Sequence, residues 1–161
     1  MERKMRRFRQ ELPIEEAKQI LMKGKECVIA VAGDDNYPYA VPINYVYDGE
    51  HIYLHSASQG HKIDALKRNP KLSLCVIDKA DIIPEEFTTY FRSVIVFGTA
   101  KFIEDERQKI EALIKLAQKY SAGIDPTAEI NRFIKTVAII EISIDKLTGK
   151  EAIELTRQRP T

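Results

Sequence analysis

The stretch DGEHIYLHSASQGHKIDAL, residues 48–66, joins a tight turn, a β-strand and a helix within a few positions. Asp48-Gly49 is typical of a β-hairpin turn, and the β-branched and aromatic residues after it predict a strand. Small polar residues then lead to a helix whose first turn contains His61 and Lys62. Positive charge is unfavourable there, because the start of a helix already carries the positive end of the backbone dipole. The stretch therefore raises the question of whether an anion binds at this helix start.

Two interpretations fit the start of this helix. In the first, unpaired backbone N–H groups bind a phosphate, helped by the hydroxyl groups of Ser56 and Ser58. Gly60 then allows close approach of the backbone, and Lys62 adds a mobile charge. In the second, Ser58 caps the helix, Lys62 points into water, and Asp64 in the first turn relieves the unfavourable charge. The residues alone leave both interpretations open.

The rest of the sequence predicts a sheet with a few helices. Apolar and alternating runs predict six strands, at residues 27–33, 37–48, 50–57, 71–78, 90–104 and 136–144. Helices are expected at 13–24, 61–69 and 105–120, with a shorter one from Asp125-Pro126 and a polar loop at 79–89. The second and third strands would form a hairpin. Gly98, inside the fifth strand, suggests a bulge or a barrel corner. The expected inner face of the helix at 105–120 consists of Ile110, Leu113, Ile114, Ala117 and Tyr120.

Six strands joined mostly by short turns predict a mainly β domain of the α+β class, an antiparallel barrel with its helices packed outside. The 161 residues are enough for a single domain spanning 1–161. Within it, the basic start MERKMRRFRQ (1–10) is expected to be a solvated, flexible arm, with a phosphate-binding arm as the less favoured alternative. Several strands are apolar on both faces, as in VIAVA and VAIIEISI, so a second copy of the chain is expected to cover part of the barrel.

The charge balance and the cysteines limit the classes of partner. Lys and Arg number 25 against 24 Asp and Glu, so general binding of nucleic acid or acidic membranes is not expected. Cys27 and Cys75 lie far apart in apolar runs, which is typical of core residues in a reducing compartment. No apolar run has the length of a membrane span and the start lacks a signal-peptide core, so a cytoplasmic location is expected.

The segment VPINY (41–45) places a proline inside a predicted strand. Because Pro42 cannot donate to the ladder, the strand is expected to have an edge, a bulge or an opening there. An opening would let backbone groups, and the Asn44 amide, pair with a flat heterocycle. A plain edge strand protected by its proline explains the segment equally simply. The tyrosines at 37, 39, 45 and 47 form a row that predicts core or dimer interface.

The sequence offers little for metal binding or nucleophilic catalysis. His51 and His55 share a strand face but lie about 13 Å apart at strand rise, too far to bind one ion, and no metal is expected. Neither cysteine lies in a catalytic motif, and no G-x-S-x-G is present. Arg92, beside Ser93, is either a clamp for a phosphate or ring carbonyl, or a surface arginine near a strand end. If the protein is an enzyme, a cofactor is expected to supply the difficult chemistry.

In their order along the chain, two long segments carry a resemblance to a known fold family. They are YPYAVPINYVYDGEHIYLHSASQGHKIDALKRNPKLSLCVID and, later, YFRSVIVFGTAKFIED. Together they resemble the FMN-binding split barrel of the pyridoxamine 5′-phosphate oxidase-like superfamily, and within it the 5-nitroimidazole resistance (Nim) proteins. The resemblance covers roughly residues 5–150.

The resemblance implies a site for FMN shared between the two subunits of a homodimer. The strand-to-helix loop would hold the phosphate through Ser56, Ala57, His61 and Lys62. The strand with Val41, Pro42, Ile43 and Asn44 would lie along the ring, and Arg92 and Ser93 would reach it from the other subunit. The oxidases have an Arg-Lys pair where this chain has His61-Lys62. They also have substrate-phosphate arginines that are not evident here, and IIEISIDKLTGK departs from their last strand.

The implied activity is that of an FMN-dependent oxidoreductase reducing the nitro group of a 5-nitroimidazole-like small molecule, with NADH or NADPH binding transiently. His55 would bind the cofactor and act as the catalytic proton donor, or be a structural histidine at the dimer interface. A non-enzymatic flavin- or haem-binding protein of the same fold is the alternative, with His55 or His61 as the haem ligand. Near-neutral charge argues against a third reading, a barrel that binds single-stranded nucleic acid.

Overall fold

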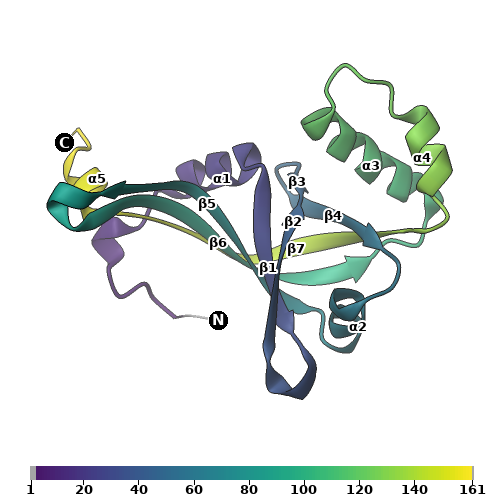
Figure 1. The fold of residues 1–161 in the computed structure, drawn as a ribbon, viewed down its shortest axis with the longest axis horizontal. Coiled ribbons are helices and arrows are strands. Elements are labelled where there is room, and N and C mark those ends of the chain that lie inside the picture. Colours follow the sequence, from purple (N-terminus) through teal and green to yellow (C-terminus); the bar gives the residue numbers. More distant parts are fainter. Residues whose placement is uncertain (1–2, 161) are drawn as a thin grey trace.

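The strands of the protein form one antiparallel sheet in the computed structural model, which describes residues 3–160 (Figure 1). In order across the sheet they are β2, β1, β5, β6, β7, β4 and β3. Their bounds are β1 (Glu26–Ala32), β2 (Pro38–Asn44), β3 (Val46–Tyr47), β4 (His51–Ala57), β5 (Lys71–Ile83), β6 (Thr88–Phe102) and β7 (Val137–Glu151). The antiparallel α+β class expected from the sequence is confirmed.

Five α-helices cover this sheet within the described residues. They are α1 (Ile14–Lys23), α2 (His61–Arg68), α3 (Glu106–Tyr120), α4 (Thr127–Phe133) and α5 (Ile153–Arg157), with 3₁₀ turns at Phe8–Gln10, Asp34–Asn36 and Pro84–Glu86. As expected, Asp105 caps α3, its carboxylate accepting from the backbone N–H of Gln108 at 2.9 Å. No helix in the described part of the chain has the length and apolar composition needed to cross a membrane.

The sheet has seven strands rather than the predicted six, because the expected strand 37–48 breaks at Tyr45. The Tyr45 ring is fully buried and its hydroxyl donates to the Leu21 carbonyl at 2.6 Å, while its backbone N–H donates to the Tyr120 hydroxyl at 3.0 Å. These contacts take Tyr45 out of the ladder. As a result β2 pairs with β1, and only the short β3 forms the predicted hairpin with β4.

The predicted polar loop at 79–89 is wrong, because β5 and β6 continue as a long two-stranded arm. Their pairing extends to Ile83 opposite Thr88, after an irregularity between Ile77 and Lys79. Figure 1 shows this arm reaching away from α3 and α4, with the end of β7 and α5 beside it. Residues 79–83 of the arm are exposed or half-buried and residues 88–93 are half-buried, so its strands show no regular apolar pattern.

Gly98 lies at the expected irregularity, a register shift between Phe97 and Gly98 in the pairing of β6 with β7. A Cβ atom there would come within 2.5 Å of Ile142 Cγ2 and 2.9 Å of the Ser143 carbonyl oxygen. A side chain at this position would therefore collide with β7, which explains the glycine.

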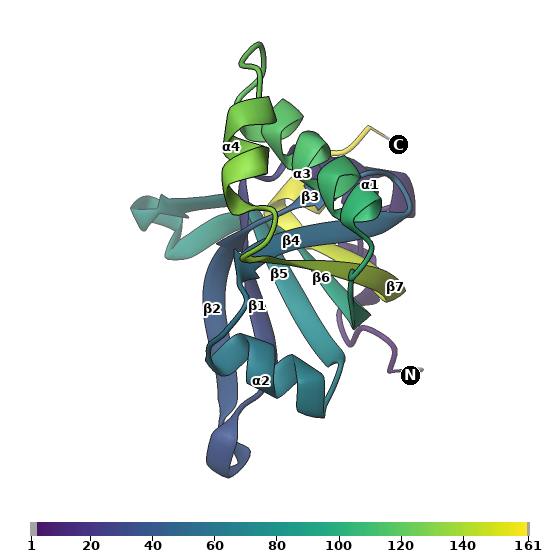
Figure 2. The same cartoon turned by 90° about the vertical axis from the view of Figure 1, so that its right-hand side faces the viewer.

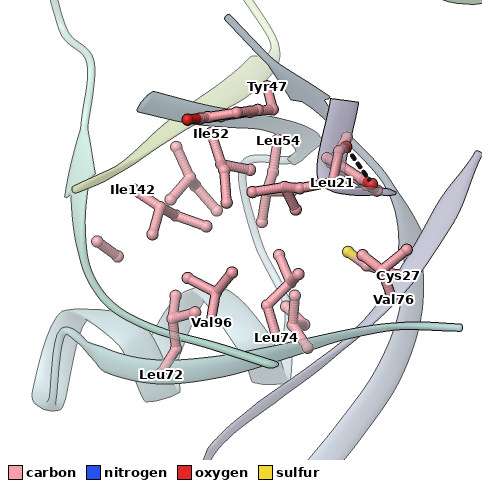
Figure 3. Packing of buried hydrophobic residues seen from close by; sticks show 14 of the residues in the cluster. Leu21, Cys27, Tyr47, Ile52, Leu54, Leu72, Leu74, Val76, Val96 and Ile142 are labelled. Atoms are coloured by element: carbon pink, nitrogen blue, oxygen red, sulfur yellow. Dashed lines mark hydrogen bonds between the residues drawn. The ribbon is translucent and has the colours of Figure 1, made fainter. Parts of the chain in front are cut away.

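The main core fills the interior of the curved sheet. Figure 3 shows Ile52 and Leu54 of β4 facing Leu72, Leu74 and Val96 across this interior. The basic segment at the start of the chain also contacts the fold, since the buried Gln10 side chain donates to the Glu151 carbonyl at 2.9 Å. The sequence-based expectation of a flexible arm concerned residues 1–10, of which 1 and 2 lie outside the described residues.

A second, smaller core lies between the sheet and α3. It consists of Val46, Tyr53, Ile103, Ala112, Leu116 and Ile139. The predicted inner face of α3 is therefore displaced by one to two residues, because Ala112 and Leu116 are buried while Ile114 and Tyr120 are 37% exposed. Leu113 and Ala117 are partly exposed and line a cavity, and Leu113 also packs against this second core.

Candidate functional site

An open cavity of 760 Å³, called here the main cavity, lies where the end of β4 meets α3 and α4. Figure 2 shows α3 and α4 on one side of β4 and α2 on the other. The polar wall comes from the end of β2 and from the β4–α2 loop. The apolar wall comes from the two helices and includes Leu113, Ala117, Ile130 and Phe133. Ser121 and Glu129 add polar groups on the helix side. A mostly apolar cavity with a few polar groups suits a flat small molecule.

The end of α3 is fixed to the sheet break at Tyr45, which holds the apolar wall in place. Lys119 Nζ lies 3.9 Å from the centroid of the Tyr45 ring and donates to the Tyr45 carbonyl at 2.9 Å. Burial lowers the pKa of Lys119, but the carbonyl and the ring face both suit a cationic amine. The tyrosine that breaks the strand thus also anchors the helix that lines the cavity.

The β4–α2 loop ends in an uncapped helix. Gly60, at φ +125°, is the residue before α2, and no side chain caps the helix. The backbone N–H groups of Ile63 and Asp64 both donate to the Gly60 carbonyl, at 3.0 and 3.1 Å. Capping by Ser58, one of the two interpretations of this stretch, is therefore wrong. The helix start keeps the N–H groups that an anion can use.

Two further groups near this helix start have no partner. Ser56 Oγ is buried and forms no hydrogen bond within the described structure. Lys62 forms no salt bridge with any carboxylate of residues 3–160. A buried hydroxyl without a partner is costly, so it points to a missing acceptor or donor. These groups fit the phosphate of a nucleotide cofactor.

His61 differs from its neighbour Lys62 because it already has partners. Its ring stacks on Tyr39 with centroids 4.1 Å apart, and its Nε2 lies 3.6 Å from Asp34 Oδ2. Asp34 is also bound by Arg68 at 2.6 Å. The side chain at 61 is thereby held against the turn between β1 and β2. Of the two basic residues predicted to meet a phosphate, Lys62 has the freer charge.

His55 lies in the wall of the main cavity, at the end of β4. Desolvation, and then the positive charge of Lys62, lower the pKa of His55 below its ordinary value of 6.5. The imidazole is therefore mainly neutral at pH 7. A neutral imidazole can donate or accept a hydrogen bond, and it becomes a proton donor only at lower pH.

The predicted ring-binding segment forms the edge strand β2. Val41 and Ile43 are half-buried and pack against the core, whereas Pro42 and Asn44 are exposed. All four pair only with β1, so the other edge of β2 is free, as expected for a strand containing Pro42. Among them, Asn44 lines the main cavity.

Arg92 and Ser93 lie at the other end of the molecule, on the arm, and pair with β5 and β7. Arg92 binds the buried Glu151 at 3.1 Å and lies 3.9 Å from Asp78, while its Nε is buried without a partner. One chain therefore brings together Asn44, His55, Ser56 and Ala57 around the cavity, with Lys62 close by. It does not bring Arg92 or Ser93 to them.

The apolar wall is the part of the site that the sequence analysis missed. Leu113 and Ala117 were recognised as apolar positions on a helix, but they were assigned to the core. Ile130 and Phe133 lie on a short helix for which no role was predicted. The available signal was an excess of apolar positions on α3, more than one buried face requires.

Comparisons with known proteins agree with this architecture. The family model of pyridoxamine 5′-phosphate oxidase matches residues 13–151. An uncharacterized protein of Rhizobium meliloti is 27% identical over 149 residues, which cover 82% of this chain and 94% of that protein.

Two solved structures have the same fold. One is a candidate 5-nitroimidazole antibiotic resistance protein from Bacteroides thetaiotaomicron, with a TM-score of 0.74 and 24% identity over 88% of this chain and 86% of that one. The other is the flavocytochrome Anf3 from Azotobacter vinelandii, with a TM-score of 0.76 and 23% identity over 98% of this chain and 79% of that one.

Proposed function

The chain belongs to the pyridoxamine 5′-phosphate oxidase family, and on that basis we propose that it is an FMN-dependent oxidoreductase acting on a small flat molecule. The nitro group of a 5-nitroimidazole is the candidate target, in keeping with the name of one structural relative. NADH or NADPH would bind transiently as the source of electrons. Flavin binding is also in keeping with the name of the flavocytochrome relative.

The start of α2 is the observation that carries this proposal. It combines a helix N-terminus without a side-chain cap with Lys62, which has no carboxylate partner among residues 3–160. Ser56 Oγ, at the end of the preceding strand β4, is buried and has no hydrogen-bond partner in the described structure. Together these groups offer backbone N–H donors, a hydroxyl and a positive charge, which are the groups that bind a phosphate dianion. Ser56, Lys62 and the N–H groups that follow Gly60 would hold the phosphate.

The residues of the main cavity would position the reactants. A bound flavin would supply the electrons for reduction. The amide of Asn44 can donate to or accept from the edge of a heterocycle, while Leu113, Ile130 and Phe133 exclude water from the reacting face. His55 would hydrogen-bond the substrate and donate a proton to it. Because its pKa is lowered, we expect the reduction rate to rise as the pH falls below 6.5.

A second copy of the chain would complete the site. Arg92 and Ser93 are remote from the main cavity in one subunit, so they can contribute only from a partner. The β5–β6 arm that carries Arg92 and Ser93 also has exposed apolar side chains. Ile77, Ile82 and Phe87 are 65%, 75% and 97% exposed. We expect dilution that dissociates the dimer to release flavin, measured by ultracentrifugation with absorbance detection. Retention of FMN by a demonstrated monomer would contradict a shared site.

The first experiment is an absorption spectrum of the purified protein, followed by titration with FMN. A flavin spectrum with saturable, stoichiometric binding is the expected result. It would justify an assay of nitro-group reduction with NADH or NADPH as reductant. Absence of flavin binding would refute the proposed activity and leave the fold and family unaffected.

Haem binding by a non-enzymatic protein is the second candidate. Its specific support is the lowered pKa of His55 beside an apolar cavity, because a neutral imidazole nitrogen is the form that ligates iron. The same spectrum separates the two candidates. Reconstitution with haem would give a Soret band that His55→Ala removes, whereas FMN binding would persist in that variant.

A further inference from the structure

A second, smaller pocket adjoins the main cavity. It has a volume of 210 Å³, and both cavities are lined by Ser58 and Val137. Three lysines from different parts of the fold line it: Lys67 at the end of α2, Lys109 at the start of α3, and Lys135 in the turn between α4 and β7. We call it the lysine pocket.

The charges around the lysine pocket are not balanced. None of the three lysines forms a salt bridge with a carboxylate of residues 3–160. Their closest interactions are weak: Lys109 Nζ is 3.4 Å from the Val137 carbonyl, and Lys67 Nζ is 5.9 Å from the centroid of the Phe102 ring. Among the residues lining the pocket, Glu104 has the one negative side chain. Three like charges around one pocket repel each other unless an anion joins them.

The lysine pocket differs from the phosphate site at the start of α2 in the lysines that form it. Lys62 does not line the pocket, and Lys67 lies more than one helical turn further along α2. Ser58 and Ile63, which flank the start of α2, do line it, so the two basic sites adjoin. A ligand with a single phosphate needs one of them. Two such sites suit a ligand with more than one phosphoryl group, or two ligands bound at the same time.

We propose that Lys67, Lys109 and Lys135 bind a phosphoryl group of a dinucleotide whose flat ring lies in the main cavity. The choice of a ring-bearing ligand rests on the proposed function, whereas the anion site itself does not. Two classes of dinucleotide have this chemistry: flavin adenine dinucleotide, bound in place of FMN, and a nicotinamide dinucleotide such as NADPH, bound next to the flavin. The two cavities adjoin at Ser58 and Val137, which line both, so the ring and a phosphoryl group of one ligand would lie on either side of these residues.

Calorimetric titration with inorganic pyrophosphate tests the anion site without any flavin. We expect saturable binding that Lys109→Gln/Lys135→Gln weakens by about tenfold or more, as for loss of charge-assisted hydrogen bonds. Glu104→Gln should strengthen binding, because it removes the one carboxylate of the pocket; this gain cannot arise from misfolding. The charge-matched control Lys23→Gln/Lys101→Gln changes two exposed lysines elsewhere and should have little effect. Equal losses in both double variants, or no saturable binding to the wild type, would overturn the proposal.

Titration with FMN, FAD and NADPH then distinguishes the two sources of the phosphoryl group. If it belongs to the flavin, FAD binds more tightly than FMN, and Lys109→Gln/Lys135→Gln removes that difference. If it belongs to the reductant, the double variant weakens NADPH binding to the FMN-loaded protein and leaves the affinity for FMN unchanged. No change for either dinucleotide would refute the proposal, even where FMN binds normally. Failure of FMN to bind would refute the proposed function, while the pyrophosphate titration would still decide the lysine pocket.

Discussion

Charged groups are paired at the end of the molecule that carries the β5–β6 arm, called the arm end, and several are left unpaired, within the described part of the chain, at the end that carries the main cavity, called the cavity end. At the arm end, the buried carboxylate of Glu151 accepts hydrogen bonds from Arg92 and Arg159, and Arg159 also binds both carboxylate oxygens of Glu16. At the cavity end, Lys62 and the three lysines of the lysine pocket have no carboxylate partner among residues 3–160, and Ser56 Oγ has no hydrogen bond.

This difference separates groups that hold the fold from groups that are available to a ligand. A buried carboxylate is tolerated only when cations and hydrogen bonds compensate its desolvation, so the network around Glu151 ties α1 and the C-terminal α5 to the sheet. Unpaired polar groups at the cavity weaken the folded state and would be compensated when an anion binds. The comparison can be tested by removing one charge at each end.

The largest expected effect is on stability, at the arm end. Glu151→Gln leaves Arg92 and Arg159 without their shared carboxylate. We expect the free energy of unfolding to fall by about 3 kcal/mol, at the low end of the range for a broken buried pair because both arginines are partly exposed. Urea denaturation measures it. The control Glu15→Gln removes only the exposed pair with Lys18 and should cost less than about 1 kcal/mol. Equal effects would mean that the buried network adds nothing.

The next effect is on binding, at the cavity end. Lys62→Ala should weaken FMN binding by about 1–3 kcal/mol, the range for losing one charge-assisted hydrogen bond. Its stability without ligand should change little, since the lysine has no carboxylate partner in the described part of the chain. Lys71→Ala is the matched control, because that lysine already pairs with Asp145 at 3.0 Å. An unchanged FMN affinity in Lys62→Ala would remove this residue from the site.

The smallest expected effect is a difference in pH dependence between the two ends. Desolvation, and then Lys62, lower the pKa of His55, so below pH 6.5 the unfolded chain binds a proton that the folded chain does not. Stability contributed by His55 should therefore decline as the pH falls from 6.5, and His55→Asn should remove this decline. Urea midpoints measured between about pH 7 and pH 5 detect it. An identical decline in the variant would show that another group is responsible.

The arm end should respond only at a lower pH. Burial alone would raise the pKa of Glu151, but hydrogen bonds from Arg159 and Arg92 outweigh it and lower the pKa below 4.5. The unfolded chain then takes up this proton first, so the stabilisation is present above about 4.5 and is lost as the pH falls further. In Glu151→Gln, the loss of stability below about pH 4.5 should be smaller. The decline in stability below pH 6.5, attributed to His55, should remain. If Glu151→Gln instead reduced the decline in stability near pH 6.5, that decline would belong to Glu151 and not to His55.

The sequence predicted the local features well. Local chemistry was sufficient to identify the Asp48-Gly49 turn, the helix that starts near His61, the Asp105 cap and the irregularity at Gly98. Ordered motifs along the chain were sufficient to recognise the family. Each of these features depends on residues that are close together in sequence, or on the order of motifs along the chain.

The sequence-based predictions that were wrong concern features that depend on contacts between residues distant in the sequence. The strand break at Tyr45 depends on Leu21 and Tyr120, which are distant in the sequence. The arm at 79–89 forms through strand pairing in a segment whose exposed and half-buried residues show no apolar alternation. The rotation of α3 depends on which of its apolar positions meet the sheet and which line a cavity. No local pattern contains this information.

The sequence by itself determined most of the element types, the loop at 79–89 and the break at Tyr45 excepted, because turn chemistry, capping and strand alternation act over a few residues. It also determined the family and the residues of the β4–α2 loop. The tertiary structure decided which charges are paired. Only folding brings Glu16 and Arg159 together with Glu151, and only folding leaves Lys67, Lys109 and Lys135 around one pocket without a carboxylate partner within residues 3–160. Electrostatic energy depends on distance in space and on burial, and the spacing of residues along the chain specifies neither.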